Sequence, residues 1–402
     1  MKNAVKPVHL SLSELLYKKQ VLLKELEAKL SRESIEKARS DYHARRLPRP
    51  CGITVHVALG CTYRCTYCYL PDMGFSFKEY RLYGLRGDEL AYALLSNKAF
   101  LPGRLGTFIA IGSVGEPLGD DALFAKTLEY LNSIERHLGN PTQIATKAAL
   151  DEEKAARLAR FKMPLSILVT IVTLKNSEKL EPGAPDPWSR LETIRRLRKA
   201  GAKPFLFLRP IIPGINDEEA EDIVREAARQ GAYGVVVGGF RASPAILARL
   251  KAQGFSTREV EKRLRGPLKA GRQTPVYTRD IKEKVVEFAK KKGVVPFLSA
   301  CCANNYTAFL ATGQRVPCAG LDFVDGKFCT RCPVMCEDIP VEIDETEVTR
   351  HVKRLTSLNN VEARIEGFYI KLVGMDSARA YRRLKGWKKI LLETAYRRRV
   401  VA

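Results

Sequence analysis

The sequence lacks any apolar run long enough to cross a bilayer. Its longest such run, LSILVTIVTL, is far shorter than the about 20 apolar residues that a transmembrane helix needs. The opening segment, MKNAVKPVHLSLSELLYKK, also lacks the continuous apolar stretch of a secretory signal. We therefore expect a cytoplasmic protein with no membrane partner.

Acidic residues are few relative to basic ones. The 45 Asp and Glu residues against 68 Lys and Arg give a formal net charge of +23. Such a surface attracts polyanions, with nucleic acid or nucleotide-like substrates as natural candidates. A solvated Lys- and Arg-rich surface like that of heat-adapted proteins explains the charge equally well. The content of 45% hydrophobic and 28% charged residues excludes a disordered or fibrous chain.

Histidine is also scarce, with five residues against ten cysteines, so thiolates have to carry any metal site. Nine of the cysteines fall into two clusters, and the tenth, Cys51, is expected to be a buried apolar residue. This distribution suits metal ligation in a reducing compartment better than a disulfide framework.

From Ile53 onward, short β-branched runs alternate with amphipathic helical stretches, which is typical of βα units around a parallel sheet. Six strands are predicted, in ITVHVAL, FIAIGSV, TQIATK, LSILVTIV, PFLFLRPI and GVVVGGF. Helices are predicted to begin near Asp88, Asp120, Asp151, Pro187 and Asp217. The predicted fold class is α/β, a partial (βα)6 TIM-like barrel. A further helix over about 279–292 leads to VVPFLSA, which favours one more strand.

Four regions are predicted along the chain. Residues 1–50 form a helical basic extension, because leucines recur near helical spacing among many charges. Residues 51–300 form the barrel, residues 301–340 a cysteine-rich metal-site region, and residues 341–402 a basic α/β tail.

Cys61, Cys65 and Cys68 directly follow the first predicted strand, in GCTYRCTYCYL. Their CxxxCxxC spacing puts three thiolates on one short loop, where they can bind three corners of a cube-like cluster. A structural zinc site normally takes four protein ligands, and no fourth Cys or His follows nearby. The spacing therefore favours a [4Fe-4S] cluster with one open iron.

This motif resembles that of the radical S-adenosylmethionine (SAM) superfamily, in which an aromatic residue precedes the last cysteine, as Tyr67 does here. The resemblance covers about residues 51–240. It implies that the open iron chelates SAM and that reductive cleavage yields methionine and a 5′-deoxyadenosyl radical, which abstracts hydrogen from a substrate. It also implies a reducing partner such as ferredoxin or flavodoxin, and it places Tyr67 near the adenine.

Further SAM-binding residues are expected at the strand ends. Gly115, Glu116 and Pro117 follow the second strand and look like the family's glycine-rich SAM motif, although a simple turn is the alternative. Thr146 and Lys147 end the third strand, where a cation can pair with the SAM carboxylate.

On the fourth strand, Ser166 and Thr170 share one face by side-chain alternation and are expected to point into the barrel, toward the ribose hydroxyls. Arg209 ends the fifth strand. The alternative for each residue is a structural polar group. The stretch LEPGAPDPWSRLETIRRLRKAG, followed by RPIIPGIND, resembles the branch related to spore photoproduct lyase, which implies radical chemistry on a nucleobase or similar anion.

A second group of thiolates is supplied by Cys318, Cys329, Cys332 and Cys336, enough for a complete second metal site. An auxiliary [4Fe-4S] cluster is the functional interpretation, because many radical SAM enzymes carry one in a carboxy-terminal extension. Structural zinc is the alternative. We expect this metal-bound extension to cover the open end of the barrel.

Cys301 and Cys302 are adjacent, so a strand that continued through them would point only one side chain into the barrel. That cysteine is a candidate hydrogen-atom donor, as in the lyase branch, or a cluster ligand in place of Cys318. A buried thiol is the alternative.

The tail RAYRRLKGWKKILLETAYRRR interleaves basic residues with Tyr381, Trp387 and Tyr396, which suits RNA or DNA contact. The apolar residues are explained as well by an amphipathic helix that packs on the barrel through Leu384, Trp387, Ile390 and Leu391. The sequence thus predicts a radical SAM enzyme. The alternatives are a nucleic-acid-binding module with structural zinc sites and a cluster-carrying redox protein without SAM chemistry.

Overall fold

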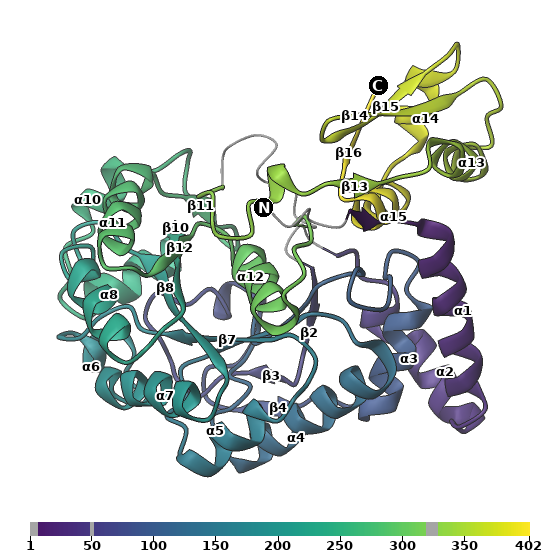
Figure 1. Ribbon diagram of the computed structural model, residues 1–402. Helices are drawn as coiled ribbons and strands as arrows, with labels where there is room; N and C mark the ends of the chain where they lie inside the picture. Colours follow the sequence, from purple (N-terminus) through teal and green to yellow (C-terminus); the bar gives the residue numbers. More distant parts are fainter. Residues whose placement is uncertain (1–6, 49–51, 319–328) are drawn as a thin grey trace, which may run out of the picture.

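A seven-stranded parallel sheet forms the centre of the computed structural model, which describes residues 7–48, 52–318 and 329–402 (Figure 1). Cys51 lies outside the described residues. The strands follow one another in chain order across the sheet: β2 (Ile53–Val55), β5 (Ile109–Ile111), β6 (Thr142–Thr146), β7 (Leu165–Thr170), β8 (Lys203–Ile211), β9 (Gly234–Gly239) and β12 (Val295–Phe297). The partial α/β barrel is confirmed, and VVPFLSA supplies the seventh strand.

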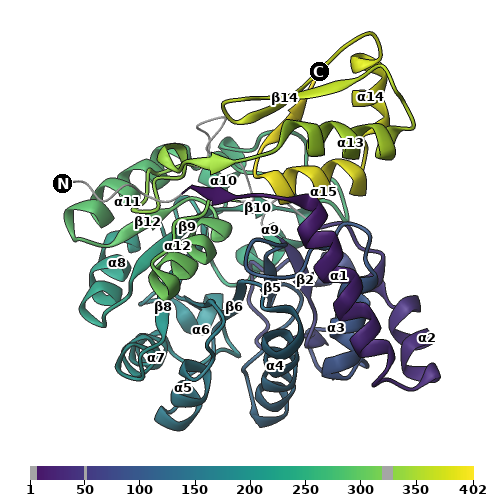
Figure 2. The ribbon, with the colours of Figure 1, turned by 45° about the vertical axis from the view of Figure 1, so that its right-hand side comes forward.

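The helices that connect these strands cover the outer face of the sheet (Figure 2). They are α3 (Gly87–Ser96), α4 (Asp121–Ser133) with the π-helical turn Ile134–Leu138, α5 (Glu152–Ala159), the short α6 (Ser177–Leu180), α7 (Pro187–Lys199), α8 (Ala220–Arg229) and α11 (Arg279–Lys291). Asp120, Asp151 and Asp186 accept backbone N–H bonds as amino-terminal caps of α4, α5 and α7. The cap residue of α3 is Arg86, and α8 begins after Asp217, whose carboxylate instead accepts from the Gly214 N–H.

The inner face of the sheet is covered by α12 (Ala300–Thr312), which lies on the side away from α4, α5 and α7 (Figure 1). Leu168, Phe205 and Phe297 point inward and pack against Tyr306 of this helix, whose ring lies 5.7 Å from that of Phe297. The chain turns into a helix at Ala300, so β12 does not continue as a strand through Cys301 and Cys302.

Two insertions extend the carboxyl-terminal ends of the strands. The first, after β2, holds the antiparallel pair β3 (Ala58–Gly60) and β4 (Tyr80–Leu82) with the 3-10 turn Pro71–Met73 between them. The second, between β9 and α11, consists of β10 (Arg241–Ala242), α9 (Pro244–Ala252), α10 (Arg258–Lys262) and β11 (Thr274–Pro275).

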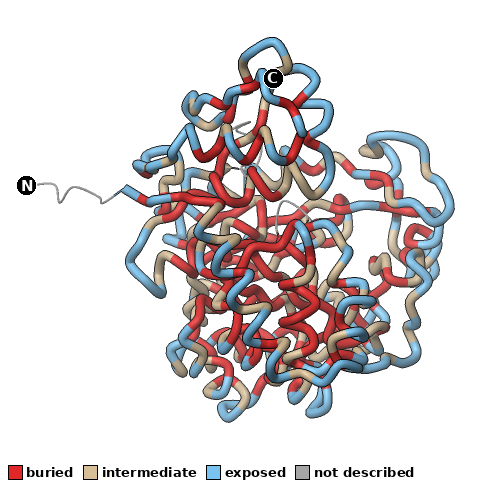
Figure 3. The backbone as a smooth tube through the Cα atoms, turned by 90° about the vertical axis from the view of Figure 1, so that its right-hand side faces the viewer, coloured by how far each residue is buried: buried red, intermediate tan, exposed pale blue. Residues whose placement is uncertain are grey.

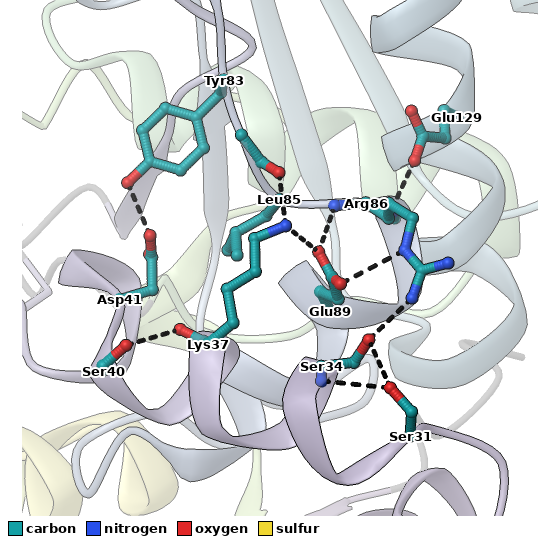
Figure 4. A network of polar contacts seen from close by, with 12 residues as sticks. Ser31, Ser34, Lys37, Ser40, Asp41, Tyr83, Leu85, Arg86, Glu89 and Glu129 are labelled. Atoms are coloured by element: carbon teal, nitrogen blue, oxygen red, sulfur yellow. Dashed lines mark hydrogen bonds and ion pairs between the residues drawn. The ribbon is translucent and has the colours of Figure 1, made fainter.

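The amino-terminal extension forms two helices, α1 (Leu12–Glu27) and α2 (Arg32–Ser40), followed by the 3-10 turn Tyr42–Ala44. The buried Lys19 of α1 donates to the carbonyls of Asn97 (2.5 Å) and Phe100 (2.8 Å) at the carboxyl end of α3. Figure 4 shows how α2 docks on the same helix: Lys37 Nζ lies 2.9 Å from a carboxylate oxygen of Glu89.

The two ends of the chain meet. β1 (Val8–His9) pairs in parallel with β13 (Val341–Glu342), which is followed by α13 (Glu345–Thr356), β14 (Glu362–Glu366), β15 (Tyr369–Val373), α14 (Ser377–Arg383), α15 (Trp387–Tyr396) and β16 (Arg399–Val401). The last three strands form a sheet in the order β14-β15-β16. The Glu347 carboxylate accepts from Ser11 and from the Tyr396 hydroxyl, so the two ends share one core (Figure 3).

The packing of the two chain ends buries some of the tail residues and leaves others exposed. Tyr396 is fully buried and Leu384 and Leu391 lie in the core, whereas Tyr381 is exposed. Tyr396 therefore cannot stack on a base, in contrast to the expectation. In the described parts of the chain, no helix combines the length and apolarity that crossing a membrane requires.

Candidate active site

Cys61, Cys65 and Cys68 lie on the loop that follows β3, at the carboxyl-terminal edge of the sheet. Burial raises the pKa of Cys65 to about 12; nearby Lys147 opposes this shift, and negative charge on Cys68 and Cys61 adds to it. The three thiols lie on one folded loop, in which the Cys68 N–H donates to the Cys65 carbonyl (3.0 Å). Because ligation requires thiolates, a bound metal has to supply positive charge beyond that of Lys147, which does not offset the effect of burial. The residues fit a metal cluster.

The segment 180–184, which belongs to the LEPGAPDPWSR stretch, lies directly against this loop. The Thr66 N–H donates to the Leu180 carbonyl (2.9 Å), and the Gly183 N–H donates to the Tyr63 carbonyl (3.0 Å). A side chain at Gly183 would bring its Cβ within 2.6 Å of the Thr62 carbonyl oxygen, so glycine permits this close approach.

Tyr67 is held by a buried group of charges. Its hydroxyl donates to Glu181, whose other carboxylate oxygen lies 2.6 Å from Arg190 Nη2, and both charged side chains have no exposed surface. Arg190 also donates to the carbonyl of Thr170 (2.8 Å). Lys147 Nζ lies 3.9 Å from Glu181 and 5.7 Å from the centre of the Tyr67 ring. Although burial lowers the pKa of Lys147, Cys65 and Glu181 outweigh this effect and raise it, so the ammonium stays charged.

The loop after β5 packs on the same edge. Gly115 lies against β3, since a Cβ there would be 2.8 Å from the Gly60 carbonyl oxygen. The buried Glu116 carboxylate accepts from the Thr146 hydroxyl and from the Lys147 N–H (2.8 Å). This loop, including Pro117, lines a small pocket with the end of the first strand, residues 55–58. The structure therefore brings the predicted residues 115–117, 146 and 147 together with the three cysteines.

The other predicted SAM-binding residues differ in position. Thr170 ends β7 at the site, but Ser166 is the second residue of that strand and is separated from the site by the layer of Leu168, which packs with α12. Arg209 is exposed. Burial of Tyr69, in the cysteine loop, raises the pKa of its hydroxyl, and the positive charge of Arg209 opposes this shift.

A part of the site that sequence reasoning missed comes from the β9–α11 insertion. Arg249 of α9 donates to the carbonyls of Thr66 (3.1 Å) and Cys68 (2.5 Å). Phe240, Ile246 and other apolar residues of the insertion pack with Tyr63, Cys65 and Tyr67. The insertion therefore shields one side of the cysteine loop from water.

The second cysteine group also converges. Cys302 lines one pocket together with the four cysteines predicted as ligands, Cys318, Cys329, Cys332 and Cys336. Cys301 is fully buried beside them, with its Sγ 3.7 Å from that of Cys318. The pair at 301 and 302 thus joins the second group.

This second group lies at the opposite edge of the sheet from the first. Phe108, the residue before β5, packs with Cys301 and Cys318, and Asn304 approaches the carbonyl of Pro141, the residue before β6, at 3.4 Å. A strand of the length of β6, five residues, spans about 17 Å. Cys301 and Cys302 are therefore not placed to donate a hydrogen atom at the first site, and the described cysteines of the extension lie away from that site.

Comparison with known proteins gives distant relatives. The chain is 25% identical over 188 residues to an uncharacterized protein of Acidianus two-tailed virus, covering 43% of this chain and 60% of the relative. It is 27% identical over 168 residues to an uncharacterized protein of Methanocaldococcus jannaschii, covering 40% of this chain and 61% of the relative. The match thus spans about three fifths of the length of these relatives.

Among solved structures, a variant of spore photoproduct lyase superposes with a TM-score of 0.51 at 19% identity, over 62% of this chain and 78% of that one. At this identity the likeness concerns the fold alone. Residues 55–227, which include the three-cysteine loop, β5 to β8 and most of α8, match the model of the radical SAM superfamily, and the chain therefore contains a radical SAM domain.

Proposed function

We propose that the chain is a radical SAM enzyme that holds a [4Fe-4S] cluster through Cys61, Cys65 and Cys68. When bound, the cluster and SAM supply a 5′-deoxyadenosyl radical that abstracts hydrogen from a substrate. The observation that carries the proposal is the meeting of three thiols, buried at Cys65 and half-buried at Cys61 and Cys68, with Lys147 and the Gly115 loop at one edge of the sheet.

The protein's own residues bind and orient the cofactors. Lys147 offers an ammonium for the SAM carboxylate, because its contact with Glu181 is 3.9 Å, longer than a hydrogen bond. Glu116 accepts from the Lys147 N–H and so fixes the loop that contains Gly115. The backbone of this loop would hold the methionyl amine of SAM. Tyr67 presents its ring beside the cysteines, and the β9–α11 insertion excludes water from one side.

We predict that the anaerobically reconstituted full chain, after chemical reduction, converts SAM to methionine and 5′-deoxyadenosine, measured by liquid chromatography. Iron, sulfide and zinc should be quantified on the same sample. Zinc without iron at the first site would instead favour the nucleic-acid-binding module, and no 5′-deoxyadenosine from iron-loaded protein would favour a cluster-carrying redox protein without SAM chemistry. In the cell, we propose that a ferredoxin or flavodoxin supplies the electron.

We further propose that the second cysteine group binds a second [4Fe-4S] cluster. Five thiols around one pocket supply more than the four ligands that it needs. Zinc is the alternative, because the 3.7 Å between the sulfurs of Cys301 and Cys318 is near the about 3.8 Å edge of a tetrahedron with Zn–S bonds of about 2.3 Å.

RNA or DNA is proposed as the partner of the basic tail. Arg379, Arg382 and Lys385 are exposed around Tyr381, and they can be exchanged without touching the core. We expect the triple change to Gln to weaken nucleic-acid binding and to flatten its salt dependence by up to about three counterions. The matched control replaces the exposed Lys290, Lys291 and Lys292 near α11. Binding is measured by fluorescence anisotropy from low to high salt. Equal binding by both variants would exclude the tail as the nucleic-acid-binding surface.

A further inference from the structure

Arg397, the residue after α15, has a charge that the described part of the chain leaves uncompensated. It is fully buried, and its backbone has a φ of 52°, in the left-handed region. Nη2 donates to the carbonyls of Leu105 and, at 3.0 Å, Gly106, while the guanidinium lies 5.4 Å from the centre of the Phe108 ring. Nε and Nη1 have no hydrogen-bond partner among the described residues.

In the described part of the chain, no carboxylate is bonded to the Arg397 guanidinium, and thiols lie nearby. Phe108, which its guanidinium contacts, packs directly with Cys301 and Cys318. Burial lowers the pKa of Arg397 to about 10, and Cys318 and Cys336 act against that shift, so the group carries its charge at neutral pH. No ion pair forms between Arg397 and an acidic side chain in the part of the chain that the structure describes.

A buried cation of this kind is costly unless an anion accompanies it. Thiols in their neutral form do not supply one, but a metal centre ligated by thiolates does. Four thiolates around Zn²⁺ carry a net charge of about −2, and a [4Fe-4S] cluster with four thiolates is likewise anionic. Its sulfurs accept N–H hydrogen bonds, which the free Nε and Nη1 can donate.

We propose that Arg397 is the counter-charge of the second metal centre and donates hydrogen bonds to its thiolate sulfurs. The inference rests on the second metal site proposed above and goes beyond it by naming the residue that makes this site selective for an anionic centre. The contact between Arg397 and the metal centre also has a structural consequence. The cysteines come from α12 and from the segment before β13, whereas Arg397 comes from the end of α15, so metal binding ties the carboxy-terminal sheet to the amino-terminal edge of the barrel.

Arg398 provides a matched control. It is also buried and near the same chain end, but its guanidinium lies 5.2 Å from the centre of the Phe368 ring and donates to the Arg397 carbonyl. Burial alone lowers the pKa of Arg398, with no cysteine involved. An Arg398→Gln change therefore removes a buried charge from the same segment without removing the proposed contact.

The experiment uses the full chain carrying Cys61→Ala, Cys65→Ala and Cys68→Ala, so that metal at the second site is measured by itself. We expect this protein to retain iron and sulfide. Arg397→Gln in the same background should lose several-fold of the bound metal and shift the reduction potential of the remaining cluster to more negative values. Arg397→Lys should restore part of both, and Arg398→Gln should leave both unchanged.

Equal metal content and potential in the Arg397→Gln and Arg398→Gln proteins would overturn the proposal, since both losses would then be structural. Zinc without sulfide in the parent protein would overturn the iron-sulfur assignment of the second site. In that case, retention of zinc by Arg398→Gln and its loss from Arg397→Gln would still support the counter-charge.

Discussion

Replacement of Cys65 by alanine is expected to abolish SAM cleavage. Cys65 is the buried member of the three-thiol loop, with its pKa raised to about 12, and its neighbours Cys61 and Cys68 are half-buried. Two thiolates do not hold a cube-like cluster, so the iron of one cluster, about four atoms per chain, should be lost. We expect 5′-deoxyadenosine formation to fall below detection.

Thr62 provides the control for this prediction, because it is exposed on the same loop. Thr62→Ala should retain iron and activity close to those of the parent. Iron analysis, electron paramagnetic resonance of the reduced protein and product chromatography measure the effect. Full iron content in Cys65→Ala would show that another residue replaces the thiolate and that the three-cysteine assignment is wrong.

The parts of the fold that the sequence predicts correctly are those with local signals. Strands β2, β5, β6, β7 and β9 contain β-branched residues and β8 is rich in Phe and Leu, while Asp120 and Asp151 cap helices where a short acceptor side chain precedes an amphipathic stretch. The carboxyl-terminal edge of a parallel sheet then gathers the loops after successive strands, so Gly115, Lys147 and the cysteine loop could be placed together before the structure was known.

The structure departs from prediction where contacts are long-range. The segment ACCANNYTAFLAT after β12 forms α12 inside the barrel, because Tyr306 and Ala303 find an apolar inner face on β7 to β9. No local signal distinguishes this helix from a continuing strand. For the same reason, the second cysteine group was expected at the open end and lies instead beside Phe108 and Pro141.

Glu181 and Arg190 were also missed, because Glu181 accepts from Tyr67, 114 residues away in the chain, and Arg190 joins the group through Glu181. One signal was present in the sequence. Arg190, Ile194 and Leu197 recur at helical spacing on one face of α7, and all three are buried. A charged residue on an apolar helical face needs a buried partner, which the structure shows to be Glu181.

This buried pair gives the second large expected effect. Arg190→Met leaves the Glu181 carboxylate without its ion-pair partner at 2.6 Å, in a site with no exposed surface. Loss of one partner of a buried pair costs about 3–5 kcal/mol. Lys147, at 3.9 Å from Glu181, offsets part of that cost. We therefore expect the free energy of unfolding of the metal-free protein, measured by chemical denaturation, to fall by an amount near the lower end of this range.

The control lies on the same helix. Arg195 forms an ion pair with Glu192, and its side chain is half exposed. Arg195→Met should leave the free energy of unfolding nearly unchanged, because exposed pairs of this kind contribute little. Equal stability of the Arg190→Met and Arg195→Met proteins would contradict the buried-pair interpretation.

A double change separates stability from positioning. Glu181→Gln with Arg190→Met removes both charges, so much of the lost stability should return. The amide is a weaker acceptor for the Tyr67 hydroxyl than the carboxylate, and Lys147 loses its anionic neighbour. If the Glu181–Arg190 pair serves to position the cysteine loop, the double variant should regain stability. It should nevertheless show an altered electron paramagnetic resonance spectrum of the reduced cluster and a raised KM for SAM. If the pair serves stability alone, both readouts should return to those of the parent, because the loop would then keep its place through the backbone bonds of Thr66 and Gly183.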